Sequence, residues 1–205
     1  MRYFAITFVL ALLFYSCDTS GSVEDTTVVE VVNETAIDEE TAEEDRWANF
    51  VHSSITVEPY YYPNSEIEYT YNEYGHLASK IEEGDRLVFY YLEIAGDKID
   101  TITGQRLADS GYKKGLIFAI DADKTEFKLE KANFSTALAK YDFGSNTPEQ
   151  GYFNVTNGFI EGTKISETEW EITTDIIWTI PANENHEDIH REFELTSNFI
   201  PAPEE

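Results

Sequence analysis

The chain has 205 residues, of which 40 are acidic and 14 basic, and its formal net charge at pH 7 is −26. This excess of acids argues against binding to nucleic-acid phosphates or anionic lipid headgroups, because both need clustered Lys and Arg. The length allows one ordinary domain with appendages, and a single cysteine excludes an intramolecular disulfide framework.

Residues 1–16, MRYFAITFVLALLFYS, have the pattern of a secretory signal peptide. Arg2 is the only charge, the residues from Tyr3 to Tyr15 are mostly apolar, and Ser16 is small. An export signal combines a positive start, a short apolar core and a small residue before the cleavage site. The apolar run is shorter than the roughly 20 residues that span a bilayer as a helix. We therefore expect residues 1–16 to be removed and the mature chain to have no transmembrane helix.

Cys17 follows directly, and the sequence Phe14-Tyr15-Ser16-Cys17 resembles the lipobox of bacterial lipoproteins. In that family the signal peptidase cuts before a cysteine that carries a diacylglyceryl group. The resemblance implies lipid attachment at Cys17, and two or three acyl chains hold a protein at a membrane far more firmly than one. The position of Asp18 directly after the cysteine resembles an inner-membrane retention signal of enterobacterial lipoproteins. The sequence as a whole, however, resembles lipoproteins of Bacteroidota. We therefore predict a lipid-anchored protein of the cell envelope, with the outer membrane favoured, at its periplasmic face or the cell surface.

Residues 17–45 are predicted to be the lipidated cysteine and an acidic, disordered tether. From Asp18 to Asp45 the chain has eleven acids and no Lys or Arg. High net charge with few aromatic residues is typical of a segment that buries too little surface to fold. Near the end of this stretch, acids precede the apolar residues Trp47, Phe50 and Val51, which favours one short helix over 38–51, either packed on the domain or only nascent.

Residues 46–205 are predicted to form one β-rich globular domain. Tyr, Phe, Thr and Ile alternate with polar residues in seven runs, and glycine-containing turns separate many of them. The runs are 66–71, 86–91, 126–129, 151–155, 169–173, 176–180 and 191–195. No long helical segment lies between them. The pattern therefore predicts an all-β fold, an antiparallel meander that forms a barrel or a sandwich.

The run IEYTYNEYGHLASKIEEGDRLVFYYLEIAGDKIDTIT repeats a strand, a glycine turn and a new strand at a spacing of 21 residues. It resembles the YD or RHS-type repeats of bacterial surface proteins, and also lipoproteins of Bacteroidota that carry a few such hairpins. The resemblance covers 37 of the 205 residues, implies a β-hairpin meander and confers no activity. The stretch 151–195 resembles uncharacterised β-barrel or β-sandwich lipoproteins of the same phylum, a domain family of unknown function.

The sequence His186-Glu187-Asp188-Ile189-His190 matches the H-E-x-x-H motif. On a helix, the two His residues of this motif bind Zn²⁺ and the Glu polarises a water molecule. Here Pro181 and several Asn and Asp residues surround the motif, between two strand patterns, and beyond Glu194 the only acids left to act as a third ligand are the two terminal glutamates. We interpret the segment as a polar hairpin loop and predict no metal site; a zinc-dependent hydrolase is the least favoured alternative.

Two further groups of residues have ordinary structural interpretations. The segment Asp121–Glu126 is acidic, but it lacks the glycine and the twelfth-position Glu of an EF-hand, so we predict a β-turn. Several aromatic residues would stack on sugar rings only if they were exposed, and in β domains such residues mostly fill the core. They are Tyr60, Tyr61, Tyr62, Trp47, Trp170 and Trp178.

No Ser-His-Asp pattern, phosphate-binding glycine loop or dinucleotide fingerprint is present, so we predict no catalytic residues, no cofactor and no enzymatic activity. We expect a lipid-anchored envelope lipoprotein with a binding or assembly domain of unknown specificity. Its partners would be the membrane, through the lipid on Cys17, and an envelope protein or a glycan, but not nucleic acid. The main alternative is a carrier of a small apolar ligand or lipid inside a β-barrel, which requires an interior cavity and is incompatible with a solid core.

Overall fold

The computed structural model describes residues 48–73, 76–145, 150–184 and 186–203. These residues form strands and no helix, which confirms the all-β prediction, and they include no helix long and apolar enough to cross a membrane. The strands are β1 (Phe50–His52), β2 (Ile55–Tyr71), β3 (Leu77–Ala95), β4 (Lys98–Asp100), β5 (Arg106–Leu107), β6 (Tyr112–Asp121), β7 (Glu126–Glu130), β8 (Lys140–Ser145), β9 (Gly151–Ser166), β10 (Glu169–Ile180) and β11 (Ile189–Pro201).

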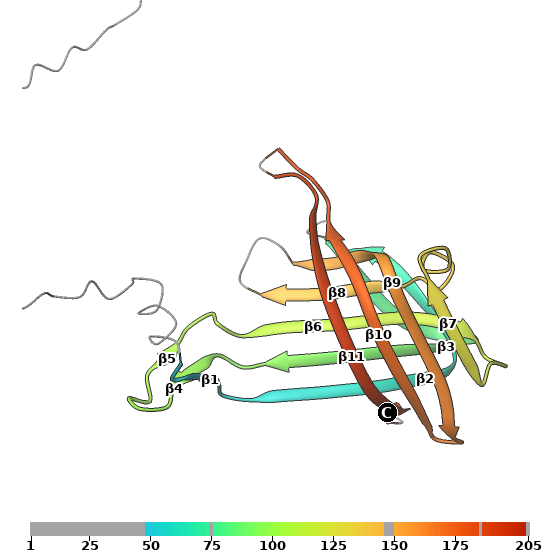
Figure 1. The fold of residues 1–205 in the computed structure, drawn as a ribbon, viewed down its shortest axis with the longest axis horizontal. Coiled ribbons are helices and arrows are strands. Elements are labelled where there is room, and N and C mark those ends of the chain that lie inside the picture. Colours follow the sequence, from blue (N-terminus) through green and yellow to red (C-terminus); the bar gives the residue numbers. More distant parts are fainter. Residues whose placement is uncertain (1–47, 74–75, 146–149, 185, 204–205) are drawn as a thin grey trace, which may run out of the picture. The chain divides into compact units, whose positions relative to one another are not determined.

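Eight of these strands form one sheet that closes into a ring (Figure 1). Seven of them, in the order β2, β3, β6, β8, β9, β10 and β11, make the ring itself, and β7 pairs with the distal part of β9. The predicted antiparallel pairing holds except where β11 returns to β2, because Ile200 and Pro201 run parallel to Tyr60 and Tyr61. Strand direction cannot alternate at every step around a ring of seven, so one parallel pair is unavoidable.

Aromatic side chains fill the inside of the ring. Every second residue of a strand points to the same face of its sheet, and the inward set includes Phe89, Phe118, Trp170 and Phe199, each at most 2% exposed. The centroid of the Phe89 ring lies 5.1 Å from that of Phe118, 5.3 Å from Trp170 and 5.7 Å from Phe199. These separations are those of direct ring packing. At this level, therefore, side chains occupy the space that an internal ligand would need.

The β2–β3 hairpin extends beyond the part that belongs to the ring, and its distal half folds over the outer face of the ring. The pairing register shifts at Ser65, beside Asn64, whose φ of 52° lies in the left-handed region. An irregularity of this kind bends a strand and increases its twist. Beyond the bend, Ile67 packs with Val88 of β3 and Ile117 of β6 in a second, smaller core. The distal half of the hairpin thus forms an outer layer on part of the ring.

The helix predicted over 38–51 is wrong at its C-terminal end. Phe50 and Val51 belong to β1, which pairs antiparallel with β4, while residues 38–47, including Trp47, lie outside the described residues. A short helix is only marginally stable in isolation, because its nucleation is unfavourable. Pairing with β4 provides the backbone groups of these residues with partners in another strand.

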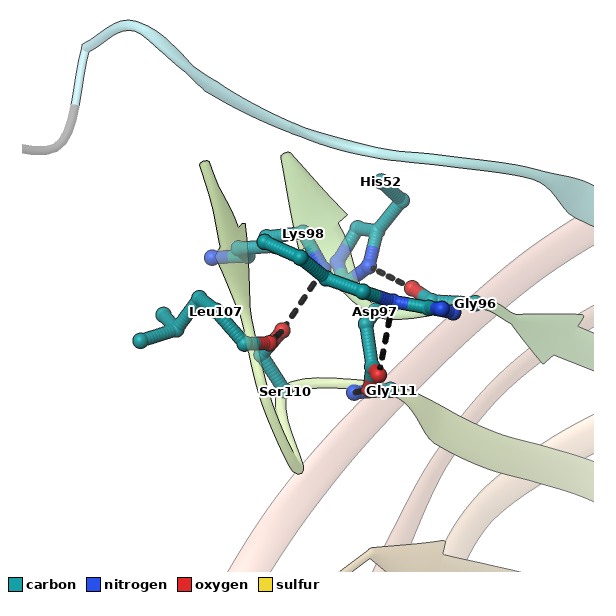
Figure 2. A network of polar contacts seen from close by, with 8 residues as sticks. His52, Gly96, Asp97, Lys98, Leu107, Ser110 and Gly111 are labelled. Atoms are coloured by element: carbon teal, nitrogen blue, oxygen red, sulfur yellow. Dashed lines mark hydrogen bonds and ion pairs between the residues drawn. The ribbon is translucent and has the colours of Figure 1, made fainter. Parts of the chain in front are cut away.

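The small sheet of β1, β4 and β5 is fastened to the end of β3 by polar contacts (Figure 2). Nδ1 of His52 lies 2.7 Å from the carbonyl oxygen of Gly96. The Asp97 carboxylate accepts a hydrogen bond from the backbone N–H of Gly111 at 3.1 Å and pairs with Nε of Arg106 at 3.1 Å. These contacts tie loops and strand ends together, so we interpret this network as structural.

Replacing Phe89 with Ala should lower the free energy of unfolding by about 3–5 kcal/mol, because a fully buried ring at the centre of the core is removed. Urea-induced unfolding measures the change. Ile102→Ala, at a side chain that is 75% exposed, is the control, and its effect should stay below about 0.5 kcal/mol. If both variants unfold at the urea concentration of the wild type, the account of the core is wrong.

Candidate functional site

The H-E-x-x-H segment lies on a loop and at the start of a strand, as the hairpin interpretation predicted. His186 forms an isolated bridge with Asn183, and Ile189 and His190 begin β11. Nδ1 of His186 lies 2.7 Å from the carbonyl oxygen of Glu187, and Nδ1 of His190 lies 2.9 Å from Oγ1 of Thr179. The two imidazoles therefore do not share a helix face. Among all described residues, no three His, Cys, Asp or Glu side chains gather closely enough to hold a metal ion.

The acidic segment Asp121–Glu126 forms the predicted turn. The backbone N–H of Lys124 donates to the carbonyl oxygen of Asp121 at 3.3 Å, where β6 ends and before β7 begins. The segment therefore connects two strands.

Glu93 is a buried carboxylate on the inner face of β3, 9% exposed. The Tyr91 hydroxyl donates to its Oε2 at 2.8 Å, the Tyr112 hydroxyl to its Oε1 at 2.5 Å, and Nζ of Lys114 lies 2.9 Å from Oε1. Burial alone raises the pKa of Glu93, but the hydrogen bonds from Tyr112, Lys114 and Tyr91 together outweigh it and lower this pKa. Burial and the bond to Glu93 also raise the pKa of Tyr112 to about 12. The charge of Glu93 is thus compensated within the protein, where it links β3 to β6.

A cleft of about 820 Å³ opens on the outer face of the ring, beside the tip of the β2–β3 hairpin. The end of β2, the start of β3 and the loop of residues 131–139 form its walls, and the first residue of β8 and residues 154–156 of β9 complete it. This volume is typical of sites for small ligands. We call it the Lys131–Lys140 cleft. Its lining includes Tyr69, Tyr71, Lys131, Ser135, Lys140 and Asn154.

The Lys131–Lys140 cleft is lined by two lysines and by no Asp or Glu. Within the described part of the chain, neither Lys131 nor Lys140 forms an ion pair, whereas Lys113 pairs with Asp142 at 2.6 Å. In a chain with a net charge of −26, two unpaired ammonium groups make a local positive region. Four other clefts on the described surface include carboxylates, among them Glu161, Asp121, Asp142 and Glu194.

Lys140 is held in the cleft by neutral groups. Its Nζ donates to Oδ1 of Asn154 at 2.5 Å and lies 5.5 Å from the centroid of the Tyr69 ring. Burial lowers the pKa of the Lys140 amine, because these two partners carry no negative charge to offset the lost hydration. A bound anion would supply a negative charge beside the amine and stabilise its protonated form.

The loop of residues 131–139 is a fixed wall of the cleft. Phe134 anchors it in the main core at 3% exposure, and the backbone N–H of Ala139 donates to the Phe134 carbonyl at 2.9 Å. Leu138 has a φ of 53°, a conformation that is uncommon for a residue with a side chain. Its carbonyl oxygen accepts a hydrogen bond from the Tyr69 hydroxyl at 2.8 Å. Such a conformation persists only where neighbouring structure enforces it, so the cleft is preformed.

Tyr71, the last residue of β2, is 76% exposed in this cleft. The cleft therefore combines ammonium groups, an amide, a hydroxyl and an exposed aromatic face. Its lining contains no His, Cys, Asp or Glu, the residues that most often serve as general bases or activated nucleophiles. This set of groups is suited to holding an anion.

The residues singled out in the sequence lie elsewhere. Cys17, the predicted lipid attachment site, lies outside the described residues, and so does Trp47. Trp170, Trp178 and Tyr61 are buried in the core, as the structural interpretation predicted, and Tyr60 and Tyr62 are half-buried. Tyr71 and the two lysines were not predicted from the sequence. The available signal for Tyr71 was its position at the end of the predicted run 66–71, in a repeat of strand, glycine turn and strand.

Comparison of the sequence with models of known protein families, with curated proteins and with solved structures finds no match.

Replacing Glu93 with Gln should destabilise the domain at neutral pH, because Lys114 loses its ion-pair partner. The pKa of Glu93 is lowered in the fold, so its stabilising contribution is present above the ordinary glutamate value of 4.5 and is lost as the pH falls through the folded value. Urea unfolding of both proteins between pH 7 and pH 3 should therefore show a gap in stability that narrows towards acid. Glu171→Gln, on an exposed residue of β10, is the control. A gap that stays constant over this range would contradict the role of the ionised carboxylate.

Proposed function

We propose that this chain is a lipid-anchored protein of the cell envelope whose β domain is a binding module, not an enzyme. The observation that carries the binding function is the Lys131–Lys140 cleft, where a strongly acidic chain presents two lysines without a carboxylate partner among the described residues. We infer that the cleft takes an anionic ligand, which would compensate both ammonium groups.

The proposed anchor rests on the sequence alone. Phe14-Tyr15-Ser16-Cys17 resembles a lipobox, and the eleven acids from Asp18 to Asp45 suit a tether that keeps the domain away from the lipid surface. The outer membrane, at either face, is the proposed location.

A carrier of an apolar ligand inside the ring is the alternative function. The packing of Phe89 against Phe118, Trp170 and Phe199 argues for a ligand bound outside the ring. A zinc-dependent hydrolase has less support, since His186 and His190 lie on a loop and at a strand start.

Labelled palmitate supplied to cells that express the full chain tests the anchor. The wild-type protein should incorporate the label, and Cys17→Ser should not, because the thiol that accepts the lipid is missing. Ser16→Ala keeps a small residue before the cysteine and should be labelled like the wild type. Equal labelling of Cys17→Ser would overturn the lipid attachment.

Binding of dextran sulfate to the full-length protein in detergent tests the cleft, with uncharged dextran as the negative probe. The double variant Lys131→Gln/Lys140→Gln should bind dextran sulfate about tenfold more weakly, because two charge-assisted contacts are lost. Lys98→Gln/Lys124→Gln removes the same charge outside the cleft and should retain most of the affinity. Equal losses in the two double variants would show that binding depends on overall charge, which contradicts the proposed site.

A further inference from the structure

We propose that the ligand of the Lys131–Lys140 cleft is an acidic saccharide, a sugar chain whose rings carry carboxylates. This inference rests on the proposed function, because it names the class of anion that the same cleft binds. Three features of the cleft carry it: an exposed aromatic face, two amines without carboxylate partners, and polar groups with unused hydrogen-bonding capacity.

The aromatic face is the ring of Tyr71. At 76% exposure it is the most solvent-accessible of the large hydrophobic side chains that remain exposed in the described residues. A flat apolar ring that is unburied within a polar cleft matches the C–H face of a pyranose, which is apolar while its rim is polar. The ring lies at the end of a paired strand, so it can pack on a ligand with little loss of backbone freedom.

The two amines and their neighbours match the rim of such a sugar. Lys131 and Lys140 would pair with carboxylates of the ligand, and Lys140 gains most because its charge is partly desolvated. Asn154 accepts from Lys140 through Oδ1, which leaves its Nδ2 to donate to a ligand oxygen. The Ser135 hydroxyl has no side-chain hydrogen bond to the described residues and adds a donor and an acceptor.

Other anions fit the cleft less well. An extended acidic peptide binds best along an unpaired strand edge, but Lys140 on β8 is already paired on both sides, with Ile117 of β6 and Asn154 of β9. A nucleic acid carries a dense row of phosphates, which the net charge of −26 repels. A saccharide with spaced carboxylates meets the local lysines without extending over the acidic remainder of the surface.

Isothermal titration calorimetry of the full-length protein in detergent tests the inference with three probes: trigalacturonate, its methyl ester and tri-glutamate. Trigalacturonate should bind, and the methyl ester should bind at least about tenfold more weakly, because it keeps the rings and loses the charges.

Tyr71→Ala should weaken trigalacturonate binding about tenfold, whereas Tyr71→Phe, which keeps the ring, should bind like the wild type. Lys131→Gln, at an exposed residue, should also weaken binding, and unchanged thermal unfolding would show that each variant is folded.

The outcomes separate this inference from the proposed function. If dextran sulfate binds through the two lysines but trigalacturonate does not, the anion site stands and the saccharide inference is overturned. Binding of tri-glutamate as tight as that of trigalacturonate, or binding that Tyr71→Ala leaves unchanged, would likewise overturn it and favour an acidic peptide or a simple anion. If neither dextran sulfate nor trigalacturonate binds, both proposals fail.

Discussion

The packing of aromatic rings around Phe89 determines where this protein has room for a ligand. Phe118, Trp170 and Phe199 surround that ring from different strands, and all four side chains are almost completely buried. Because protein interiors pack as densely as organic crystals, this arrangement leaves little space for a guest at the centre of the ring. This packing therefore favours the outer face of the sheet as the place for the proposed ligand.

The bend in the β2–β3 hairpin then provides a place for it. A flat strand surface offers no concavity, but the distal half of the hairpin turns back at Ser65 and packs on β3 and β6 through Ile67. The loop of residues 131–139, anchored by Phe134 and bonded to Tyr69 through Leu138, stands beside it. The bent hairpin and the anchored loop thus form the two walls of the cleft, and both are in place before any ligand binds.

Charge gives this cleft its chemical character. A chain with 40 acidic and 14 basic residues has carboxylates available for nearly every lysine, and Lys113 and Lys114 are indeed paired with Asp142 and Glu93. Lys131 and Lys140 are two of the lysines without an ion pair in the described part of the chain, and the cleft brings them together. Maintaining a partly desolvated ammonium group costs stability unless a partner compensates it, which is the physical basis for assigning the cleft to an anion.

Much of the fold was predictable because it depends on local patterns, whereas the cleft depends on contacts between distant segments. Alternation such as Glu169-Trp170-Glu171-Ile172 predicts both a strand and its buried face, and the structure places Trp170 and Ile172 in the core.

The odd number of strands in the ring, and hence the parallel contact at Ile200, is a global property that no single run of residues encodes. The helix expected near Val51 failed for the same reason, since its strand partner lies about fifty residues later, at Ile99. Lys131 and Tyr71 are 60 positions apart, and only the fold of the hairpin places them in one cleft.

The titration of the Lys140 amine, followed by NMR on lysine-labelled protein, tests the central claim most directly. We expect this amine to titrate below the ordinary lysine value of 10.5, because burial lowers its pKa, and we expect trigalacturonate to raise its pKa again by supplying a negative charge. Lys124, outside the cleft, should be unaffected by the sugar. A Lys140 titration that trigalacturonate leaves unchanged, or one that changes equally at Lys124, would contradict the assignment of the Lys131–Lys140 cleft as the binding site.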